Sequence, residues 1–155
     1  MEGAFTINGR VQKLSFAAEA TLLDLLRACG CTEVKEGCRE GQCGACLVLL
    51  DGRLVNSCQV LAASALGRQI ATVRALGDVH SPHPIQSSFA ETGAVQCGFC
   101  TPGMVLAAYA LLEANPDPGE EEIRRGLDGN LCRCSGYVKI LEAVRLAAER
   151  MRAHG

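Results

Sequence analysis

The chain has 155 residues, with 15 lysine and arginine residues against 17 aspartate and glutamate residues, a net charge of −2 and 48% hydrophobic residues. This length allows one domain or two small ones and excludes a large multidomain enzyme. The near-neutral charge argues against nucleic-acid binding through bulk electrostatics. The longest apolar run, Met104 to Leu112, is too short to span a bilayer. Because the first ten residues show neither a basic start before an apolar run nor a twin arginine, we expect a cytoplasmic protein with no membrane span.

The first half of the sequence predicts short strands and one helix. Asn8-Gly9 and Asp51-Gly52 are two-residue hairpin turns, each between strand-like runs. Thr21 is a candidate N-cap, because an acidic residue follows three positions later and an apolar stripe of helical period comes next. The predicted elements are a hairpin over 5–16, a helix over 22–29, a hairpin over 47–56, a short helix near 59–65 and a strand near 69–72.

The second half predicts helices only. Residues 77–83 hold turn formers without an apolar period, and we place there a linker between a domain over 1–76 and a domain over 84–155. Thr101-Pro102 supplies an N-cap and a first-turn proline, and Asp117-Pro118 is expected to cap the next helix. The four predicted helices cover 84–91, 101–112, 117–127 and 140–151, and they are expected to form a bundle.

Ten cysteines dominate the chemistry of this sequence. In a reducing compartment structural disulfides rarely persist, so metal or redox chemistry is the leading explanation. The spacing divides eight of the cysteines into two sets of four. The first set is Cys38, Cys43, Cys46 and Cys58, and the second is Cys97, Cys100, Cys132 and Cys134. Cys29 and Cys31 match neither set, and we expect them to pack in the core or at a helix end.

The first set has the spacing of plant-type [2Fe–2S] ligands. Four residues separate Cys38 from Cys43, two separate Cys43 from Cys46, and Cys58 follows after eleven. Interleaved glycines permit the tight loop that three neighbouring ligands require. Structural zinc and simple burial of small thiols are the alternatives.

The second set is ambiguous on spacing alone. Cys97 and Cys100 lie at a predicted helix start, and Cys132 and Cys134 come before the last helix. Four thiolates suit either zinc or an iron–sulfur cluster. The free N–H groups of helix N-termini slightly favour an anionic cluster.

Three segments carry a family resemblance: VKEGCREGQCGACLVLLDG over 34–52, GAVQCGFCTPGMV over 93–105 and GNLCRCSGYVKILEAV over 129–144. In order and separation they closely resemble the small iron–sulfur subunit of molybdenum hydroxylases, the family of xanthine dehydrogenase, aldehyde oxidoreductase and CO dehydrogenase. The resemblance implies an α+β fold: an N-terminal β-grasp, ferredoxin-like domain with one [2Fe–2S] cluster, then an all-α four-helix-bundle domain with another.

The resemblance also implies the site and the partners. The second set would bind the cluster nearest the molybdenum cofactor, and the first set the cluster nearer the flavin. Gln96 and Cys134 would reach the pterin of the molybdenum cofactor. The partners would be a large molybdopterin-binding subunit and a medium FAD-binding subunit, in a dimer of heterotrimers.

These features predict an electron relay and no catalytic residue on this chain, because no acid, base or nucleophile is patterned around the cysteines. The partner subunit would hydroxylate a purine, another N-heteroaromatic compound or an aldehyde. A free-standing two-cluster ferredoxin acting as a soluble carrier is the alternative, although carriers often use a strongly charged face to find their partners.

Overall fold

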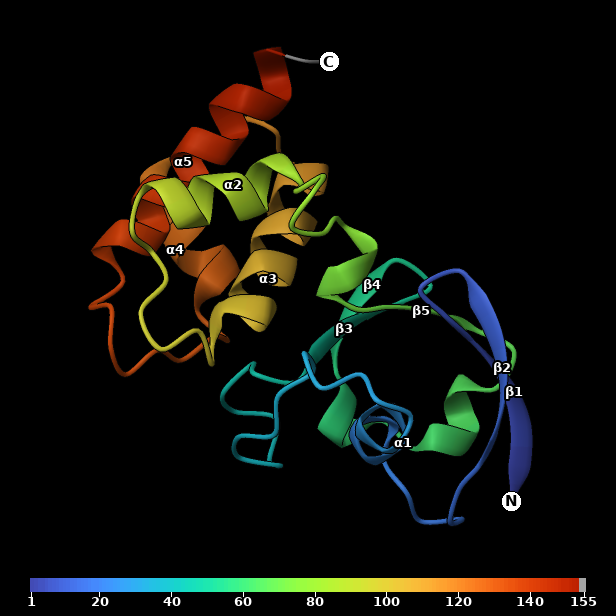
Figure 1. The fold of residues 1–155 in the computed structure, drawn as a ribbon. Helices are drawn as coiled ribbons and strands as arrows, with labels where there is room; N and C mark the ends of the chain where they lie inside the picture. Colours follow the sequence, from blue (N-terminus) through green and yellow to red (C-terminus); the bar gives the residue numbers. More distant parts are fainter. Residues whose placement is uncertain (154–155) are drawn as a thin grey trace.

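The computed structural model describes residues 1–153, which form five strands, five α-helices and three 3-10 turns. The strands and α1 come from the first half of the chain, and the other four helices come from the second half (Figure 1). The fold is therefore a mixed α and β fold with a five-stranded sheet. The strands are β1 (Glu2–Ile7), β2 (Arg10–Ser15), β3 (Leu47–Leu50), β4 (Arg53–Asn56) and β5 (Gln69–Ala71). The helices are α1 (Leu22–Ala28), α2 (Pro84–Glu91), α3 (Thr101–Ala114), α4 (Glu120–Leu127) and α5 (Val138–Ala153).

The sheet has the strand order β2-β1-β5-β3-β4. Both predicted hairpins are confirmed, because β1 pairs with β2 and β3 pairs with β4 in antiparallel register. Each turn needs two consecutive residues at positive φ: φ is 49° at Asn8 and 76° at Gly9, and the second turn repeats these values at Asp51 and Gly52. The β5 strand lies between the hairpins, parallel to β1 and antiparallel to β3.

The β3 strand separates two hydrophobic cores, which explains its uninterrupted run of apolar residues. Val48 and Leu50 belong to the core that the sheet shares with α1. Leu47 belongs instead to the core of the helical half, and Leu54 of β4 packs against that core. Successive side chains of a strand point to opposite faces, so a strand buried on both faces must be apolar throughout. The β3 and β4 strands thus pack against the helices of the second half.

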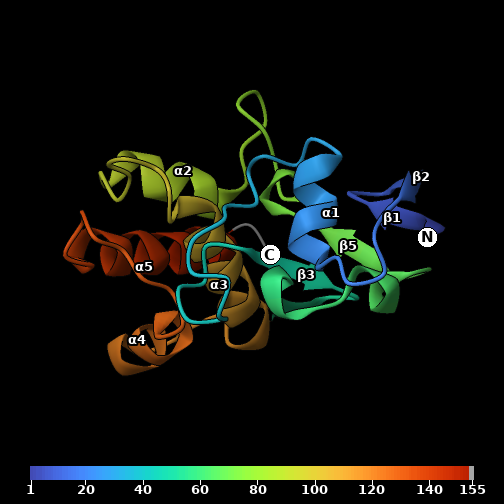
Figure 2. The same cartoon turned by 90° about the horizontal axis from the view of Figure 1, so that it is seen from below.

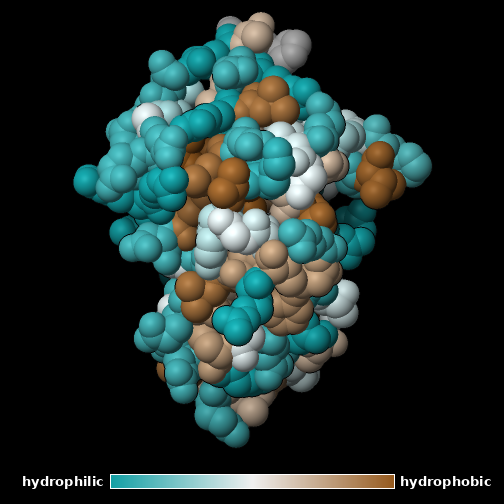
Figure 3. Space-filling view, turned by 90° about the vertical axis from the view of Figure 1, so that its left-hand side faces the viewer, coloured by the Kyte–Doolittle hydropathy of each residue, from teal (hydrophilic) through white to brown (hydrophobic). Residues whose placement is uncertain are grey.

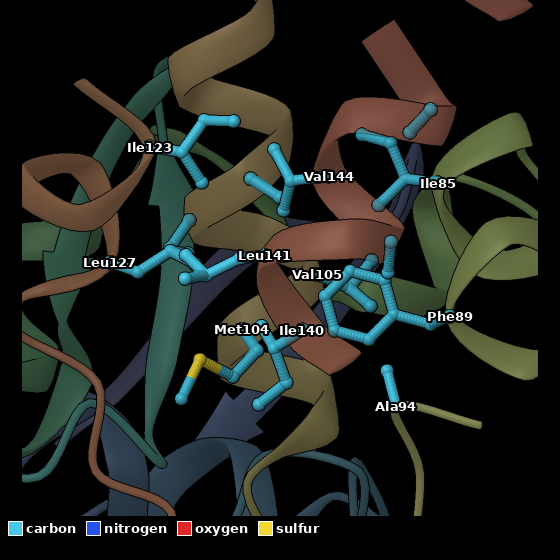
Figure 4. Close-up of a cluster of buried hydrophobic side chains, with 14 of the residues drawn as sticks. Ile85, Phe89, Ala94, Met104, Val105, Ile123, Leu127, Ile140, Leu141 and Val144 are labelled. Atoms are coloured by element: carbon cyan, nitrogen blue, oxygen red, sulfur yellow. The ribbon is translucent and has the colours of Figure 1, made fainter. Parts of the chain in front are cut away.

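The four helices of the second half surround one core. Ile85 and Phe89 of α2, Met104 of α3, Ile123 of α4 and Val144 of α5 are all at most 1% exposed. Figure 4 shows these side chains pointing toward one another from the four helices. The predicted helices are confirmed, and α3 has buried residues on nearly every side because it lies between the other helices and β3.

Three local predictions differ in detail from the structure. The short helix expected near 59–65 is a 3-10 helix over Ala62–Ala65, and a separate 3-10 helix covers Ser57–Gln59. The chain between them is extended because Leu61 forms a β-bridge with Thr21, and the Val60 carbonyl accepts the N–H of Leu22 at 2.7 Å. A backbone that is bonded to a neighbouring segment cannot continue a helix.

The caps of α3 and α4 also differ from the prediction. Thr101 is the first residue of α3, and Cys100 is its N-cap. Gly119, not Asp117, precedes α4, and its N–H donates to the Glu122 carboxylate at 2.7 Å. Asp117 lies too far from the first turn to cap it, and it forms an ion pair with Arg152 of α5 instead. Among residues 1–153, no helix is both long enough and apolar enough to cross a membrane.

Candidate metal centres

Three cysteines of the first set lie in the loop between α1 and β3, and Cys58 follows β4. Positive φ values at Arg39 (58°), Gly41 (75°) and Gly44 (68°) let this loop coil tightly. The Arg39 guanidinium holds the loop to α1 by donating to Asp24 at 2.8 Å, and it also pairs with Glu36 at 2.6 Å. The capping box of α1 orients the same aspartate, because Thr21 Oγ1 donates to Asp24 Oδ2.

The sulfurs of the first set lie in two pairs. The backbone N–H groups of Glu40 and Gln42 each donate to Cys38 Sγ at 3.3 Å. These hydrogen bonds, the one from Glu40 foremost, lower the pKa of Cys38 to about 7, with a contribution from the neighbouring Cys43. In the other pair, burial raises the pKa of Cys46 to about 11, and the adjacent Cys58 thiol adds to this rise.

The side chain of Gln59 connects Cys58 with the loop that holds the other cysteines of the first set. Gln59 Nε2 lies 3.4 Å from Cys58 Sγ and 3.0 Å from the carbonyl oxygen of Arg39. The same amide group therefore contacts one sulfur and fixes the loop that carries the other three. A hydrogen bond to a ligand sulfur stabilises negative charge on it, which is the usual way a protein tunes such a centre.

The second set is also arranged in pairs. Cys97 Sγ and Cys134 Sγ are 3.6 Å apart, and both residues are exposed. Cys100 lies beside Cys132, and burial raises the pKa of Cys100 to about 12, with the Cys132 side chain contributing. Cys100 is the N-cap of α3, but the first turn of this helix offers few free N–H groups to the pair, because Thr101 donates to the Gly98 carbonyl and Pro102 has no N–H.

Ser135 lowers the pKa of the Cys132 thiol through hydrogen bonds. Its hydroxyl donates to Cys132 Sγ at 3.1 Å, and its backbone N–H donates to the same sulfur at 3.4 Å. Burial alone would raise the pKa of Cys132, but these hydrogen bonds lower it to about 7. The backbone N–H of Cys132 donates to Tyr137 Oη at 2.9 Å, which fixes the loop before α5.

The pairwise arrangement fits a di-iron group. One tetrahedral zinc ion with bonds of about 2.3 Å would need all four sulfurs within about 3.8 Å of one another. Among residues 1–153, no three or more His, Cys, Asp or Glu side chains are placed to hold a single metal ion. Two thiolates on each of two irons, with N–H donors on the sulfurs, match the pairs that the structure shows.

The two cysteine loops touch directly. The N–H of Leu131 donates to the carbonyl oxygen of Cys43 at 2.9 Å. The Asn130 side chain, which is 4% exposed, donates to the Gly44 carbonyl oxygen at 3.3 Å. A Cβ on Gly103 would lie 2.2 Å from that same oxygen. Both views of the ribbon show the loop of residues 38–46 beside the loops that precede α3 and α5 (Figures 1 and 2).

Gln96, the two cysteines outside the sets and the histidines complete the description of the candidate residues. Gln96 is exposed directly before Cys97, and no hydrogen bond of its side chain is found among residues 1–153. Cys29 and Cys31 lie apart from both sets, and Cys31 is buried in the core of the sheet. His83 caps α2 by accepting the N–H of Ile85, whereas His154 lies outside the described residues.

Three residues at the site, Ser135, Gln59 and Asn130, belong to none of the cysteine motifs. For Ser135 the sequence does hold a signal, because a hydroxyl side chain next to a cysteine pair often bonds to nearby groups. For Gln59 the signal is weak: the residue directly follows a ligand. For Asn130 the sequence gives no signal, because its hydrogen-bond partner Gly44 is 86 residues away.

Two family models cover most of the chain. A "2Fe-2S iron-sulfur cluster binding domain" matches residues 5–70, and a "[2Fe-2S] binding domain" matches residues 72–145. Both cysteine sets therefore lie within domains defined by [2Fe–2S] binding.

Curated proteins and solved structures agree with these matches. The nicotinate dehydrogenase small FeS subunit of Eubacterium barkeri is 50% identical over 145 residues, which are 93% of this chain and 92% of that protein. The xanthine dehydrogenase iron-sulfur-binding subunit of Escherichia coli O157:H7 is 46% identical, over 90% of this chain and 89% of that one. In the crystal structure of quinoline 2-oxidoreductase from Pseudomonas putida 86, one chain superposes with a TM-score of 0.93 at 40% identity, covering 99% of this chain and 96% of the other.

These matches extend over nearly the whole length of the relatives and include both cysteine loops, so the shared architecture carries the shared role. The chain belongs to the small iron–sulfur subunits of the molybdenum hydroxylases: it is the electron-transfer subunit of an oxidoreductase complex, with two [2Fe–2S] clusters of its own.

Proposed function

We propose that Cys38, Cys43, Cys46 and Cys58 bind the cluster nearer the flavin. The other cluster would be held by Cys97, Cys100, Cys132 and Cys134 and would face the molybdenum cofactor. A bound [2Fe–2S] cluster supplies a one-electron carrier. The chain's own residues hold and orient the sulfurs: Gln59 and Ser135 donate to them, and Arg39 fixes one loop. The domains would be a β-grasp unit over 1–76 and a four-helix bundle over 84–155, linked by 77–83.

One observation carries this proposal: the hydrogen bond from the N–H of Leu131 to the carbonyl oxygen of Cys43. Leu131 precedes a ligand of the second set, and Cys43 is a ligand of the first. A single hydrogen bond thus joins the two ligand loops through their backbones. A relay subunit has to hold two carriers at a fixed short separation, and this junction would do so.

Exposed apolar side chains support a permanent partner at the second set. Val95, Phe99, Leu131 and Val138 lie within four residues of a second-set cysteine and are 41–62% exposed. Figure 3 shows that hydrophobic side chains reach the surface of the helical half in separate patches among hydrophilic ones. Such residues next to an exposed pair of ligands suit a subunit interface. The partner at this surface would be the large molybdopterin-binding subunit, and a medium subunit would carry FAD, in a cytoplasmic dimer of heterotrimers.

The substrate class follows from the relatives. Nicotinate, xanthine and quinoline, which appear in their names, are all N-heteroaromatic compounds. We therefore infer that the partner subunit of this complex oxidises an N-heteroaromatic ring and delivers the electrons to this chain.

Replacing Val138 by aspartate is expected to detach the chain from its large partner. Val138 is 62% exposed at the start of α5, where an acidic residue is compatible with the helix. Burying an unpaired carboxylate in the interface costs about 3 kcal/mol or more, which weakens binding by more than about 100-fold. Size-exclusion chromatography of native extract measures this: the wild-type chain should elute with the large subunits and the Val138→Asp chain alone, with its iron retained.

Val11→Asp is the matched control. Val11 is an exposed valine on β2, far from the second set in the sequence, and its substitution should leave co-elution unchanged. A wild-type chain that elutes alone would indicate a free-standing carrier and contradict the proposed assembly. If the Val138→Asp chain still eluted with the large subunits, the interface would have to lie elsewhere on this chain.

Gln96→Ala is expected to slow the first electron transfer without loss of iron. The exposed amide of Gln96 next to Cys97 can donate to and accept from a heterocycle of the partner's cofactor. Loss of such a second contact typically costs about 10-fold. Stopped-flow spectra of the complex should show slower reduction of the adjacent cluster, with about four irons per chain retained. Loss of iron would instead mean that the side chain is structural.

A further inference from the structure

Two thiols outside the cluster sets face each other at the end of α1. Cys29 Sγ and Cys31 Sγ are 4.0 Å apart. Gly30 lies between them with φ of +92°, a conformation that other residues rarely adopt. The chain therefore reverses at this glycine, and both neighbouring side chains turn to the same side.

The pair is reachable from solvent. Cys31 is 8% exposed and belongs to the core of the sheet, whereas Cys29 is half-buried. Both residues line a cavity of about 1180 Å³, together with Arg10, Arg74 and Glu91. Gly77, Asp78 and Pro82, from the segment that leads to α2, also line this cavity. Packing alone requires small apolar side chains, but it does not require two sulfurs that face each other beside an open cavity.

The separation of the sulfurs suits a bridging ion better than a disulfide. Two thiolates bound to one ion at about 2.3 Å each lie at most about 4.6 Å apart, so a shift of about 0.6 Å from the observed 4.0 Å would give the nearly linear geometry of a two-coordinate soft ion. A disulfide requires about 2.05 Å, so the sulfurs would have to approach by about 2 Å. Burial raises the pKa of the Cys31 thiol to about 12, and Cys29 adds to this rise, so an ion that binds here has to displace a proton held more tightly than that of an ordinary thiol.

We propose that Cys29 and Cys31 form a two-thiolate site for a soft monovalent cation of the Cu(I) type, separate from the two cluster sites. Thiolates select soft ions. Among residues 1–153, no group of three or more His, Cys, Asp or Glu side chains is arranged around one ion, so the ion must accept few protein ligands. Binding releases the two thiol protons to solvent and transfers no electron. Arg74 favours the Cys31 thiolate, and the same guanidinium pairs with Glu33, the carboxylate that opposes it.

The test is an anaerobic titration of the purified complex, with its clusters in place, with Cu(I) and a competing coloured chelator. We expect one tightly held copper per chain and unchanged cluster absorption. The Cys29→Ser and Cys31→Ser variants should each bind copper at least about 100-fold more weakly, because the second thiolate acts at a high effective concentration. Ser87→Ala, which changes another residue of the same cavity, should bind copper like the wild type.

Three results would overturn the proposal. The wild type could hold no more copper than Cys29→Ser, or copper could bind only as cluster absorption is lost. Intact-mass analysis of anaerobically prepared protein could also show the pair as a disulfide. Cys29→Ser is the decisive variant, since Cys29 is half-buried and its loss disturbs the core least.

Discussion

Cys43→Ser is expected to remove about two of four irons and to stop electron delivery to the flavin, while substrate still reduces the molybdenum centre. Cys43 supplies one sulfur of the first set, and its carbonyl oxygen accepts the hydrogen bond that joins the two loops. A serine hydroxyl is a poor substitute because iron–sulfur clusters need deprotonated, soft ligands. Iron analysis and rapid mixing of the complex with substrate measure the two effects separately.

Cys29→Ser is the matched control for this loss, because it removes a thiol that belongs to neither set. It should keep all the iron and the wild-type rate of flavin reduction. If Cys43→Ser also reduced the flavin at the wild-type rate, electrons would have to bypass the first set, and the proposed order of the two centres would be wrong.

Gly103→Ala is expected to destabilise the protein, although alanine normally favours a helix by about 1 kcal/mol relative to glycine. A Cβ at this position of α3 would lie 2.2 Å from the carbonyl oxygen of Gly44. That oxygen belongs to the backbone of the first cysteine loop, so α3 and the loop would have to separate. Overpacking of this kind costs about 1–3 kcal/mol, which lowers the melting temperature by about 3–9 °C in a chain of this size.

Gly129→Ala is the control for this substitution. Gly129 lies beside the same junction, but an added Cβ there meets nothing within 4 Å. Thermal unfolding should show a clear loss of stability for Gly103→Ala and little change for Gly129→Ala. Electron paramagnetic resonance (EPR) spectra of the reduced protein should also show weaker coupling between the two centres in Gly103→Ala. A Gly103→Ala protein more stable than the wild type would mean that the two loops are not packed as described.

The elements that could be predicted from the sequence are those specified by neighbouring residues. Asn8-Gly9 and Asp51-Gly52 specify their own turns, and the capping box of Thr21 and Asp24 marks the start of α1. The prediction for residues 59–65 missed the extended backbone at Val60 and Leu61, because distant backbone groups of Thr21 and Leu22 bond to that segment. Local propensity carries no information about such a pairing.

The candidate site also has parts that the sequence predicts and parts that depend on tertiary packing. The spacing of the cysteines selects the ligand loops, and the resemblance identifies their family. The contact between the loops joins Cys43 to Leu131, two residues that are widely separated in the sequence. The packing of α3 against β3 and against α4 brings the two loops to the same place. Ser135 is an intermediate case, because its bond to Cys132 is local but depends on a loop that Tyr137 fixes.

The most direct test of the two-cluster relay combines metal analysis with EPR on one anaerobically purified sample. We expect about four irons and four acid-labile sulfides per chain, no zinc, and two distinct signals after reduction with dithionite. Two irons with one zinc, or a single signal in a sample with a full complement of sulfide, would contradict the assignment of the second set to an iron–sulfur centre.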